Sequence, residues 1–323
     1  MQLLDLRIGF VPVNSRPRTL SFVADQIAHQ PIALGAFMNV AQPKAPPGSL
    51  FVGAGDSFAA SSIASYLSSM RHRALDPYEL IADVHLSTRK TAYFVTVSGN
   101  TASVVRAAAV VKGVAKKRVA ITANVKGKIA DVVDEVILIP SDYVPRFPGT
   151  LSFSLSLLVL LKSTSGRFVC DFLSVYSQAS RDAKKLLFSE RGTTYFLGNN
   201  AALPISQYSA LKMYEFLGVR AQAERLEEFS HAPIFSVRKG DAVNIFCAFD
   251  PLRIGQKLAT TLRQRGFNAT TIIPFGSNHF EQVFYLIFLA QLAVLQSAKS
   301  AGYSHPYFVG AKDKLAVSDS MIY

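Results

Sequence analysis

The sequence has few of the residues that mark several common classes of protein. Its two cysteines, Cys170 and Cys247, lie far apart, with no CxxC motif and no histidine at metal-ligand spacing, which argues against a zinc site and a disulfide framework. The apolar runs 151–161 and 283–295 are shorter than the roughly 20 residues that cross a bilayer. The N-terminus lacks the basic start, apolar stretch and cleavage site of a signal peptide. We therefore expect a cytoplasmic protein that neither spans nor binds a membrane, and we interpret the two runs as core helices.

A continuous basic segment is also absent, although the net charge is +12. Basic residues are scattered along the chain, with short groups at 71–73 and 116–118 and no accompanying nucleic-acid-binding motif. The charge pattern therefore does not predict nucleic-acid binding. A positive field of this kind suits small anionic substrates, because it accelerates their encounter with the protein.

What the sequence does contain is an alternation of strand and helix patterns. With 323 residues, half of them hydrophobic, the chain is long enough for two domains at about 150 residues each. Short β-branched or aromatic runs end in glycine or polar turns and precede helical stretches. Strands, some with the turn that follows them, are expected within 49–55, 91–101, 117–124, 135–141, 193–200, 242–250 and 268–276.

The alternation occurs as two consecutive series, which predicts an α/β fold made of two similar units. Strands separated by helices favour parallel sheets that are covered by helices on both faces. We place the first unit at 1–170, with an N-terminal arm, and the second at 171–323, with a C-terminal tail. The arm and the tail after Tyr303 are candidates for dimer arms or lids, and the sequence does not choose between these roles.

Ligands of parallel sheets bind beyond the carboxyl ends of the strands, where helix N-termini meet. Two turns have suitable residues: "GAGDS" at 53–57 and "TVSGNT" at 96–101. Serine, threonine and asparagine are also ordinary helix N-caps, so each turn alone is compatible with a purely structural role. "GAG" does not match a dinucleotide fingerprint, because GxGxxG would need glycine at Phe58, and NAD binding is not expected. The candidate ligand contacts in these turns are Gly55, Ser57, Thr96, Ser98, Gly99, Asn100 and Thr101.

At this level the sequence resembles the double SIS (sugar isomerase) domain family, and is most similar to the isomerase domain of glucosamine-6-phosphate synthase. "ADQIAHQP" at 24–31 resembles the family's opening helix, "GAGDS" its Gly-Thr-Ser turn, and "TVSGNT" its Ser-x-Ser-Gly-x-Thr loop. "ALKMYEF" at 210–216, followed by "AQAERLEEFSHAP" at 221–233, is similar to the family's Ala-Leu-Lys-x-x-Glu and Glu-Leu-Lys-His-Gly-Pro segments. The resemblance implies two tandem SIS domains, each a flavodoxin-like three-layer sandwich, and a phosphosugar substrate with no cofactor or metal.

The resemblance also implies catalytic roles. Glu215 would be the base that moves a proton between C1 and C2, and His231 would open the sugar ring from the neighbouring subunit of a homodimer. Lys212, three residues before Glu215 on the same helical face, would hold the carboxylate, stabilise an enediolate or form an imine. From the residues alone, a surface Lys–Glu pair and a capping or core histidine are equally ordinary interpretations.

The sequence departs from the family's pattern at several positions, which limits how far the family's residue roles apply to it. Tyr208 stands where the family helix often has a glutamate, and Leu151 in "PGTLSF" stands where a lysine would fall. Two residues, Lys312 and Lys314, are alternative counterparts of the family's C-terminal lysine. The sequence contains no glutaminase segment, so we do not expect glutamine-dependent synthesis by this chain. The expected function is aldose–ketose isomerisation of a hexose 6-phosphate, with fructose 6-phosphate as the ketose; deamination of glucosamine 6-phosphate and a non-catalytic phosphosugar sensor are the alternatives.

Overall fold

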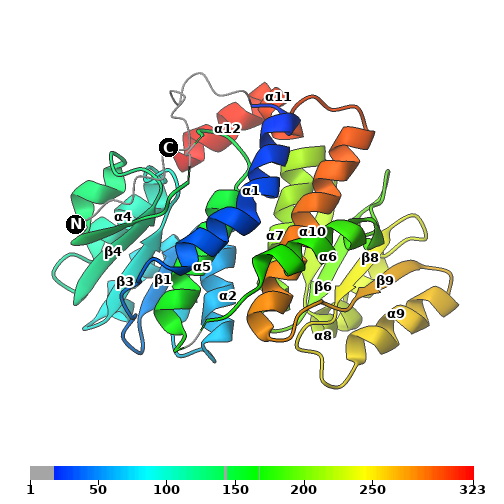
Figure 1. Cartoon of the computed structure of the whole chain (residues 1–323), viewed down its shortest axis with the longest axis horizontal. Coiled ribbons are helices and arrows are strands. Elements are labelled where there is room, and N and C mark those ends of the chain that lie inside the picture. The colour runs from blue at the N-terminus through cyan, green and yellow to red at the C-terminus, as the bar shows by residue number, and fades with distance from the viewer. Residues whose placement is uncertain (1–17, 142–143, 167) are drawn as a thin grey trace.

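The computed structural model describes residues 18–141, 144–166 and 168–323, which form two lobes, each built on a parallel sheet (Figure 1). The first sheet has the strand order β2-β1-β3-β4-β5, and the second has the order β7-β6-β8-β9. All neighbouring strands within these two sheets are parallel, as the alternating pattern predicted. The strands are β1 (Leu50–Gly53), β2 (Arg73–Leu75), β3 (Thr91–Val95), β4 (Lys117–Thr122), β5 (Glu135–Leu138), β6 (Thr194–Gly198), β7 (Ala221–Glu224), β8 (Ala242–Phe246) and β9 (Asn268–Ile272).

Helices cover both faces of each sheet, and one layer of helices is shared by the two lobes. The first lobe contributes α2 (Asp56–Leu67) and α5 (Leu151–Thr164) to this layer, and the second contributes α7 (Ala202–Leu217). The remaining members of the shared layer are α1 (Leu20–Met38), α6 (Phe172–Asp182) and α10 (His279–Ser300). The outer helices are α3 (Pro77–Ala82) and α4 (Ala102–Val110) on the first sheet, and α8 (Leu226–His231) and α9 (Ile254–Gln264) on the second.

The two faces of each strand belong to different hydrophobic cores, because successive side chains of a strand point to opposite sides. In β3, Tyr93 and Val95 join the large core of the shared layer, whereas Ala92 and Phe94 pack under α4. The same division in the second sheet separates Phe196 from its neighbours in β6. A parallel sheet with both faces buried accounts for the nearly continuous apolar strands that the sequence shows.

The two apolar runs form buried helices, as expected. Helix α10 is long and apolar enough to cross a membrane by length and composition, but 78% of its apolar window is buried inside the protein. Helix α5 is shorter, and its leucines from Leu155 to Leu161 are all inside the large core. Both helices therefore fill the layer between the sheets.

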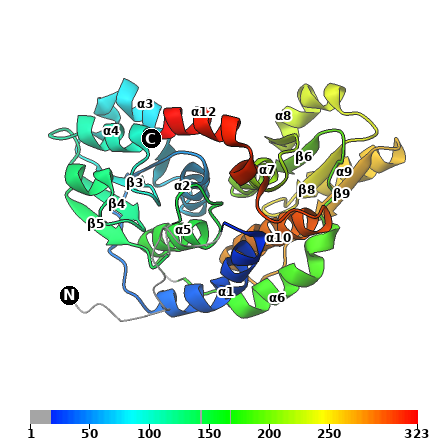
Figure 2. The same cartoon turned by 90° about the horizontal axis from the view of Figure 1, so that it is seen from above.

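The C-terminal tail is helical, which the sequence pattern did not indicate. Short α11 (Tyr307–Gly310) contacts α7 of the second lobe, and α12 (Lys312–Ile322) contacts α4 of the first lobe. Figure 2 shows α12 crossing from one lobe to the other. The predicted division at 170/171 falls just before α6 and stays a prediction, and the expected N-terminal arm lies outside the described residues.

Candidate active site

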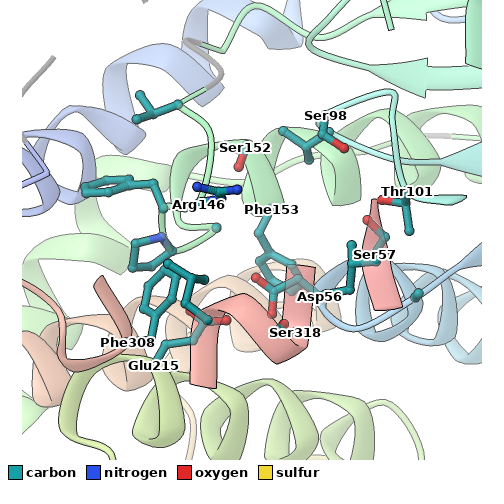
Figure 3. Close-up of a pocket in the computed structure, with 18 of the residues that line it drawn as sticks. Asp56, Ser57, Ser98, Thr101, Arg146, Ser152, Phe153, Glu215, Phe308 and Ser318 are labelled. Atoms are coloured by element: carbon teal, nitrogen blue, oxygen red, sulfur yellow. The ribbon is translucent and has the colours of Figure 1, made fainter. Parts of the chain in front are cut away.

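A cavity of about 560 Å³ opens between the lobes, at the carboxyl ends of the strands of the first sheet. Its walls come from the turns after β1, β3 and β5, from one side of α5, from the end of α7 and from α11 and α12. Figure 3 shows Ser57, Ser98 and Thr101 on one side of the cavity and Glu215 on the other. This is the position at which parallel α/β sheets bind ligands, because turns and helix N-termini converge there.

Three of the predicted turn residues, Ser57, Ser98 and Thr101, line the cavity. Ser57 lies in the first turn of α2, and Thr101 is the N-cap residue of α4, so each hydroxyl stands beside a helix N-terminus. The first N–H groups of a helix have no partner within the helix, and they carry a partial positive charge. Hydroxyls beside two such helix ends are suited to bind the oxygens of a phosphate.

The other predicted turn residues support this wall from behind. Thr96 is buried, and its Oγ1 lies 3.1 Å from Thr101 Oγ1. The Gly99 N–H donates to Thr96 O, and the Asn100 N–H donates to Ser98 Oγ, so both amides are engaged within the turn. The Asn100 side chain joins the turn to the next connection, since its Oδ1 accepts from Lys128 N at 3.0 Å. Gly55, Thr96, Gly99 and Asn100 are not among the residues that line the cavity, and their contact with a ligand stays a prediction.

Lys212 is fully buried between two carboxylates, one from each lobe. Its Nζ donates to Glu215 Oε2 at 2.5 Å within α7 and to Asp56 Oδ2 at 2.7 Å on α2. Burial alone would lower the pKa of Lys212, but the Asp56 and Glu215 carboxylates hold it above its ordinary value. A lysine in this position is a cation that organises carboxylates, since the neutral amine needed for an imine is disfavoured.

Glu215 lines the cavity, with 27% of its side chain exposed. Burial raises the pKa of Glu215 to about 7; the Lys212 ammonium lowers it, and the neighbouring Asp56 carboxylate adds to the rise. A carboxyl group with this pKa exchanges protons near neutral pH, which is what a general base requires. Asp56 also lines the cavity, although the sequence pattern singled out only its neighbours Gly55 and Ser57.

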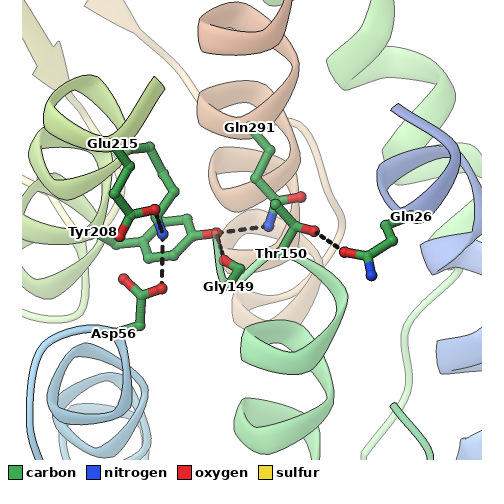
Figure 4. Close-up of polar contacts among 8 residues, drawn as sticks. Gln26, Asp56, Gly149, Thr150, Tyr208, Glu215 and Gln291 are labelled. Atoms are coloured by element: carbon green, nitrogen blue, oxygen red, sulfur yellow. Dashed lines mark hydrogen bonds and ion pairs between the residues drawn. The ribbon is translucent and has the colours of Figure 1, made fainter. Parts of the chain in front are cut away.

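Tyr208, which stands where a glutamate was expected, packs behind Lys212 and Glu215. Its ring stacks on Phe153 of α5 at a centroid distance of 3.9 Å, and Lys212 Nζ lies 4.9 Å from the ring centroid. Its hydroxyl donates to Gly149 O at 2.8 Å and accepts from Gln291 Nε2 at 2.9 Å (Figure 4). A second carboxylate beside Lys212 comes from Asp56, on the opposite lobe.

His231 lies outside the cavity of its own chain. It ends α8 on the outer side of the second lobe, its side chain is 74% exposed, and its Nε2 is 3.2 Å from Glu227 Oε1. This placement does not match a core histidine. Contact between His231 and a site in a second subunit stays a prediction.

The C-terminal helices bring further residues to the cavity. Lys314 lines it and donates to the Tyr307 hydroxyl at 3.1 Å, whereas Lys312 is not among the lining residues. Arg146, on the connection after β5, also lines the cavity and pairs with Asp319 of α12 at 2.7 Å. Sequence reasoning missed Arg146 and Asp319, since neither lies in a strand-ending turn or in a recognised motif.

This arrangement of two parallel sheets around a shared helical layer is the double SIS domain fold of phosphosugar isomerases. A superposition on glucosamine-6-phosphate deaminase from Thermotoga maritima covers 87% of this chain and 95% of that chain, with a TM-score of 0.75 and 24% sequence identity. Tagatose-6-phosphate ketose/aldose isomerase from Escherichia coli is similar over 91% of this chain and 96% of that one, with a TM-score of 0.71 and 17% identity. These similarities establish the fold that the sequence motifs predicted.

Curated relatives match in sequence over parts of the chain. A glutamine–fructose-6-phosphate aminotransferase (isomerizing) from Pyrobaculum aerophilum is 32% identical over 115 residues, which is 35% of this chain and 19% of the relative. The corresponding enzyme of Chlamydia muridarum is 28% identical over 188 residues, or 52% of this chain and 31% of the relative. The matches thus span between about a fifth and a third of the curated relatives. No protein-family profile matches the chain.

Proposed function

We propose that this chain is a phosphosugar aldose–ketose isomerase that converts a hexose 6-phosphate through an enediol, with fructose 6-phosphate as the ketose. The observation that carries the proposal is the position of Glu215. Its carboxylate faces the cavity opposite the hydroxyls of Ser57, Ser98 and Thr101, and its pKa is raised to about 7 by burial. One cavity thus joins a base for proton transfer to a wall suited to an anion.

The geometry supports a simple sequence of steps. The phosphate binds at Ser57, Ser98 and Thr101, and the open-chain sugar extends toward Glu215. Glu215 takes the proton from C1 of the ketose while the C2 oxygen gains one, which gives the enediol; return of a proton to C2 and loss of one from the C1 oxygen gives the aldose. Lys212, which is fully buried and does not line the cavity, keeps the Glu215 carboxylate in place.

Ring opening precedes these steps, and for it we propose His231 of the partner subunit. The proposal is supported by the exposed position of His231 and by its absence from the cavity of its own chain. An imidazole can both donate a proton to the ring oxygen and accept one from the anomeric hydroxyl, which is O2 in the ketose.

The test is Glu215→Gln, followed by incubation with fructose 6-phosphate in deuterated water. Wild-type protein should form the aldose and incorporate deuterium at C2, whereas the variant should bind the sugar with nearly unchanged affinity and exchange no proton. Exchange at the wild-type rate in the variant would remove Glu215 from the mechanism. Circular dichroism and calorimetric binding of the sugar phosphate confirm that the variant is folded.

A second candidate is deamination of glucosamine 6-phosphate to fructose 6-phosphate and ammonia. It is favoured by the fold shared with the Thermotoga maritima deaminase and by the two carboxylates at the sugar end of the cavity, whose charge complements an ammonium group. Release of ammonia from glucosamine 6-phosphate separates the two reactions. Saturable binding without turnover of any hexose 6-phosphate would instead indicate a sensor.

A further inference from the structure

Two oxygens in the cavity wall have no hydrogen-bond partner within the described residues. They are Asp56 Oδ1 and Ser156 Oγ, and both atoms are buried. Ser156 is only 1% exposed, on the side of α5 that faces the cavity. Buried polar atoms in native proteins are almost always paired, because an unpaired one retains the cost of its lost hydration. Neither oxygen has its hydrogen-bonding capacity met within the described residues, and Asp56, with 22% of its side chain exposed, presents a polar group to the cavity.

The two oxygens of Asp56 have different surroundings. Oδ2 accepts from Lys212 Nζ at 2.7 Å, while Oδ1 has no donor. A carboxylate has room for about four hydrogen bonds. Asp56 thus holds the lysine with one oxygen and leaves the lone pairs of the other available.

The position of Asp56 is fixed from both sides of the lobe junction. Gly149 approaches Asp56 closely: a Cβ at this position would lie 2.5 Å from Asp56 Oδ2, so a larger residue there would displace the carboxylate. The Gly149 carbonyl is in turn held by the hydroxyl of Tyr208 from the second lobe. The Asp56 carboxylate thus packs against Gly149, while Lys212 holds its Oδ2.

The chemistry of the carboxylate defines what it can bind. A phosphate would be repelled by Asp56 and Glu215, whose two charges exceed the single charge of Lys212. A group that donates a hydrogen bond, such as a hydroxyl or an ammonium, would be attracted. Asp56 should therefore face the part of the sugar that is remote from its phosphate and close to the carbons on which Glu215 acts.

We propose that Asp56 is a positioning and specificity residue: its Oδ2 holds Lys212 beside Glu215, and its Oδ1 accepts a hydrogen bond from a hydroxyl or ammonium group near the reacting carbons of the sugar. The ligand contact rests on the proposed function, whereas the hold on Lys212 does not. Ser156 contributes the second, neutral contact at the same wall.

The hold on Lys212 is tested in the ligand-free protein with Asp56→Asn, which preserves shape and removes charge. Carbon-13 NMR of the Glu215 carboxyl follows its titration, and Asp76→Asn, at the half-buried N-cap of α3, is the charge-matched control. We expect the titration midpoint of Glu215 to fall in Asp56→Asn and to stay unchanged in Asp76→Asn, because the first variant removes a neighbouring negative charge. An unchanged midpoint in Asp56→Asn overturns this part of the proposal.

The ligand contact is tested with Asp56→Ala by calorimetry, using glucosamine 6-phosphate, fructose 6-phosphate, their 1-deoxy and 2-deoxy analogues, and inorganic phosphate. Wild-type protein should bind one parent sugar about 10- to 100-fold more tightly than the analogue that lacks the contacted group, the range for a hydrogen bond to a charged acceptor. Asp56→Ala should bind parent and analogue equally and retain its affinity for inorganic phosphate. Undiminished discrimination in the variant overturns the contact.

Failure of the proposed function gives a different result from failure of this inference. If no sugar phosphate binds to the wild-type protein, the proposed function and the ligand contact both fail, and the Glu215 titration still decides whether Asp56 positions Lys212. If Asp56→Ala unfolds, the same ligands are measured with Asp56→Asn to test the ligand contact. The neutral amide should lose most of the discrimination between parent sugar and deoxy analogue.

Discussion

Arg146 and Asp319 connect the cavity wall of the first lobe to the last helix of the chain. Arg146 Nη2 lies 2.7 Å from Asp319 Oδ2, and the side chains are 47% and 18% exposed. Arg146 has a φ of +55°, a left-handed conformation that a non-glycine residue rarely adopts. This pair therefore links a constrained backbone position to α12, which covers the opening between the lobes.

Breaking this pair should loosen α12 with little effect on the rest of the fold. Because the pair is partly exposed, Asp319→Asn should lower the free energy of unfolding by less than about 1 kcal/mol. Hydrogen exchange should accelerate in α12 and stay unchanged in α5. A double-mutant cycle with Arg146→Asn is the control, because asparagine tolerates a positive φ. Amide hydrogens of α12 should exchange no faster in the double variant than in either single variant. Additive effects would show that the two residues do not act through each other.

Removing the buried lysine should be much more damaging. Lys212→Met leaves two carboxylates facing each other without their shared cation, and loss of one partner of a buried ion pair costs about 3–5 kcal/mol. Urea unfolding measures the loss. Lys185→Met is a matched control, because Lys185 pairs with Asp182 but is 57% exposed, and its loss should cost less than about 1 kcal/mol. Equal losses in the two variants would contradict the buried role of Lys212.

Glu215 should make both stability and activity depend on pH. Its folded-state pKa of about 7 lies above the ordinary value of 4.5, so its contribution to stability is fully present below pH 4.5 and is lost as pH rises through 7. The free energy of unfolding of the wild type relative to Glu215→Gln should fall by up to about 3 kcal/mol across this window. As a base, Glu215 must be ionised, so kcat/KM should rise with pH around 7. A stability difference that is constant from pH 4.5 to 8 would contradict the assigned shift.

The fold could be predicted from the sequence because periodicity and turn residues act locally. The nearly continuous apolar strands and the helices between them indicated two parallel sheets, and short apolar runs in α5 and α10 indicated core helices. Strands β2 and β7 were not anticipated: they are edge strands, and β7 is largely polar, "AQAE", so neither carries an apolar pattern. The helix α12 has no buried residue and hence no amphipathic signal.

The site could be predicted only where motifs lie within one segment. Lys212 and Glu215 are three residues apart on one helix, and Ser98 and Thr101 share one turn, so their proximity follows from local geometry. Asp56 meets Lys212 across the junction of the lobes, a relationship that depends on how the units pack. The pairing of Arg146 with Asp319 is likewise a product of tertiary structure.

The turn after β3 depends on two glycines in contact. Gly99 has a φ of +68°, and a Cβ on Gly127 would lie 2.6 Å from Gly99 Cα. Gly127→Ala should therefore displace the turn that contains Ser98. The overpacking should lower the free energy of unfolding by about 1–3 kcal/mol. The displaced turn should also raise KM for the sugar phosphate. Gly35→Ala in α1, with open space around it, is the control and should stabilise by about 0.5–1 kcal/mol. A Gly127→Ala variant with unchanged KM would show that the turn does not contact the substrate.

The proposed contribution of His231 from a partner subunit has a direct test in mixed dimers. Because the His231 side chain is 74% exposed, His231→Ala should leave the free energy of unfolding unchanged while abolishing turnover of ring-form substrate. Glu215→Gln should also be inactive. Random mixing of equal amounts of the two variants should restore about a quarter of wild-type activity, since half of the dimers are then mixed and each mixed dimer has one site with both groups intact. No recovery after verified subunit exchange would place both residues in one chain's site, or remove His231 from the reaction.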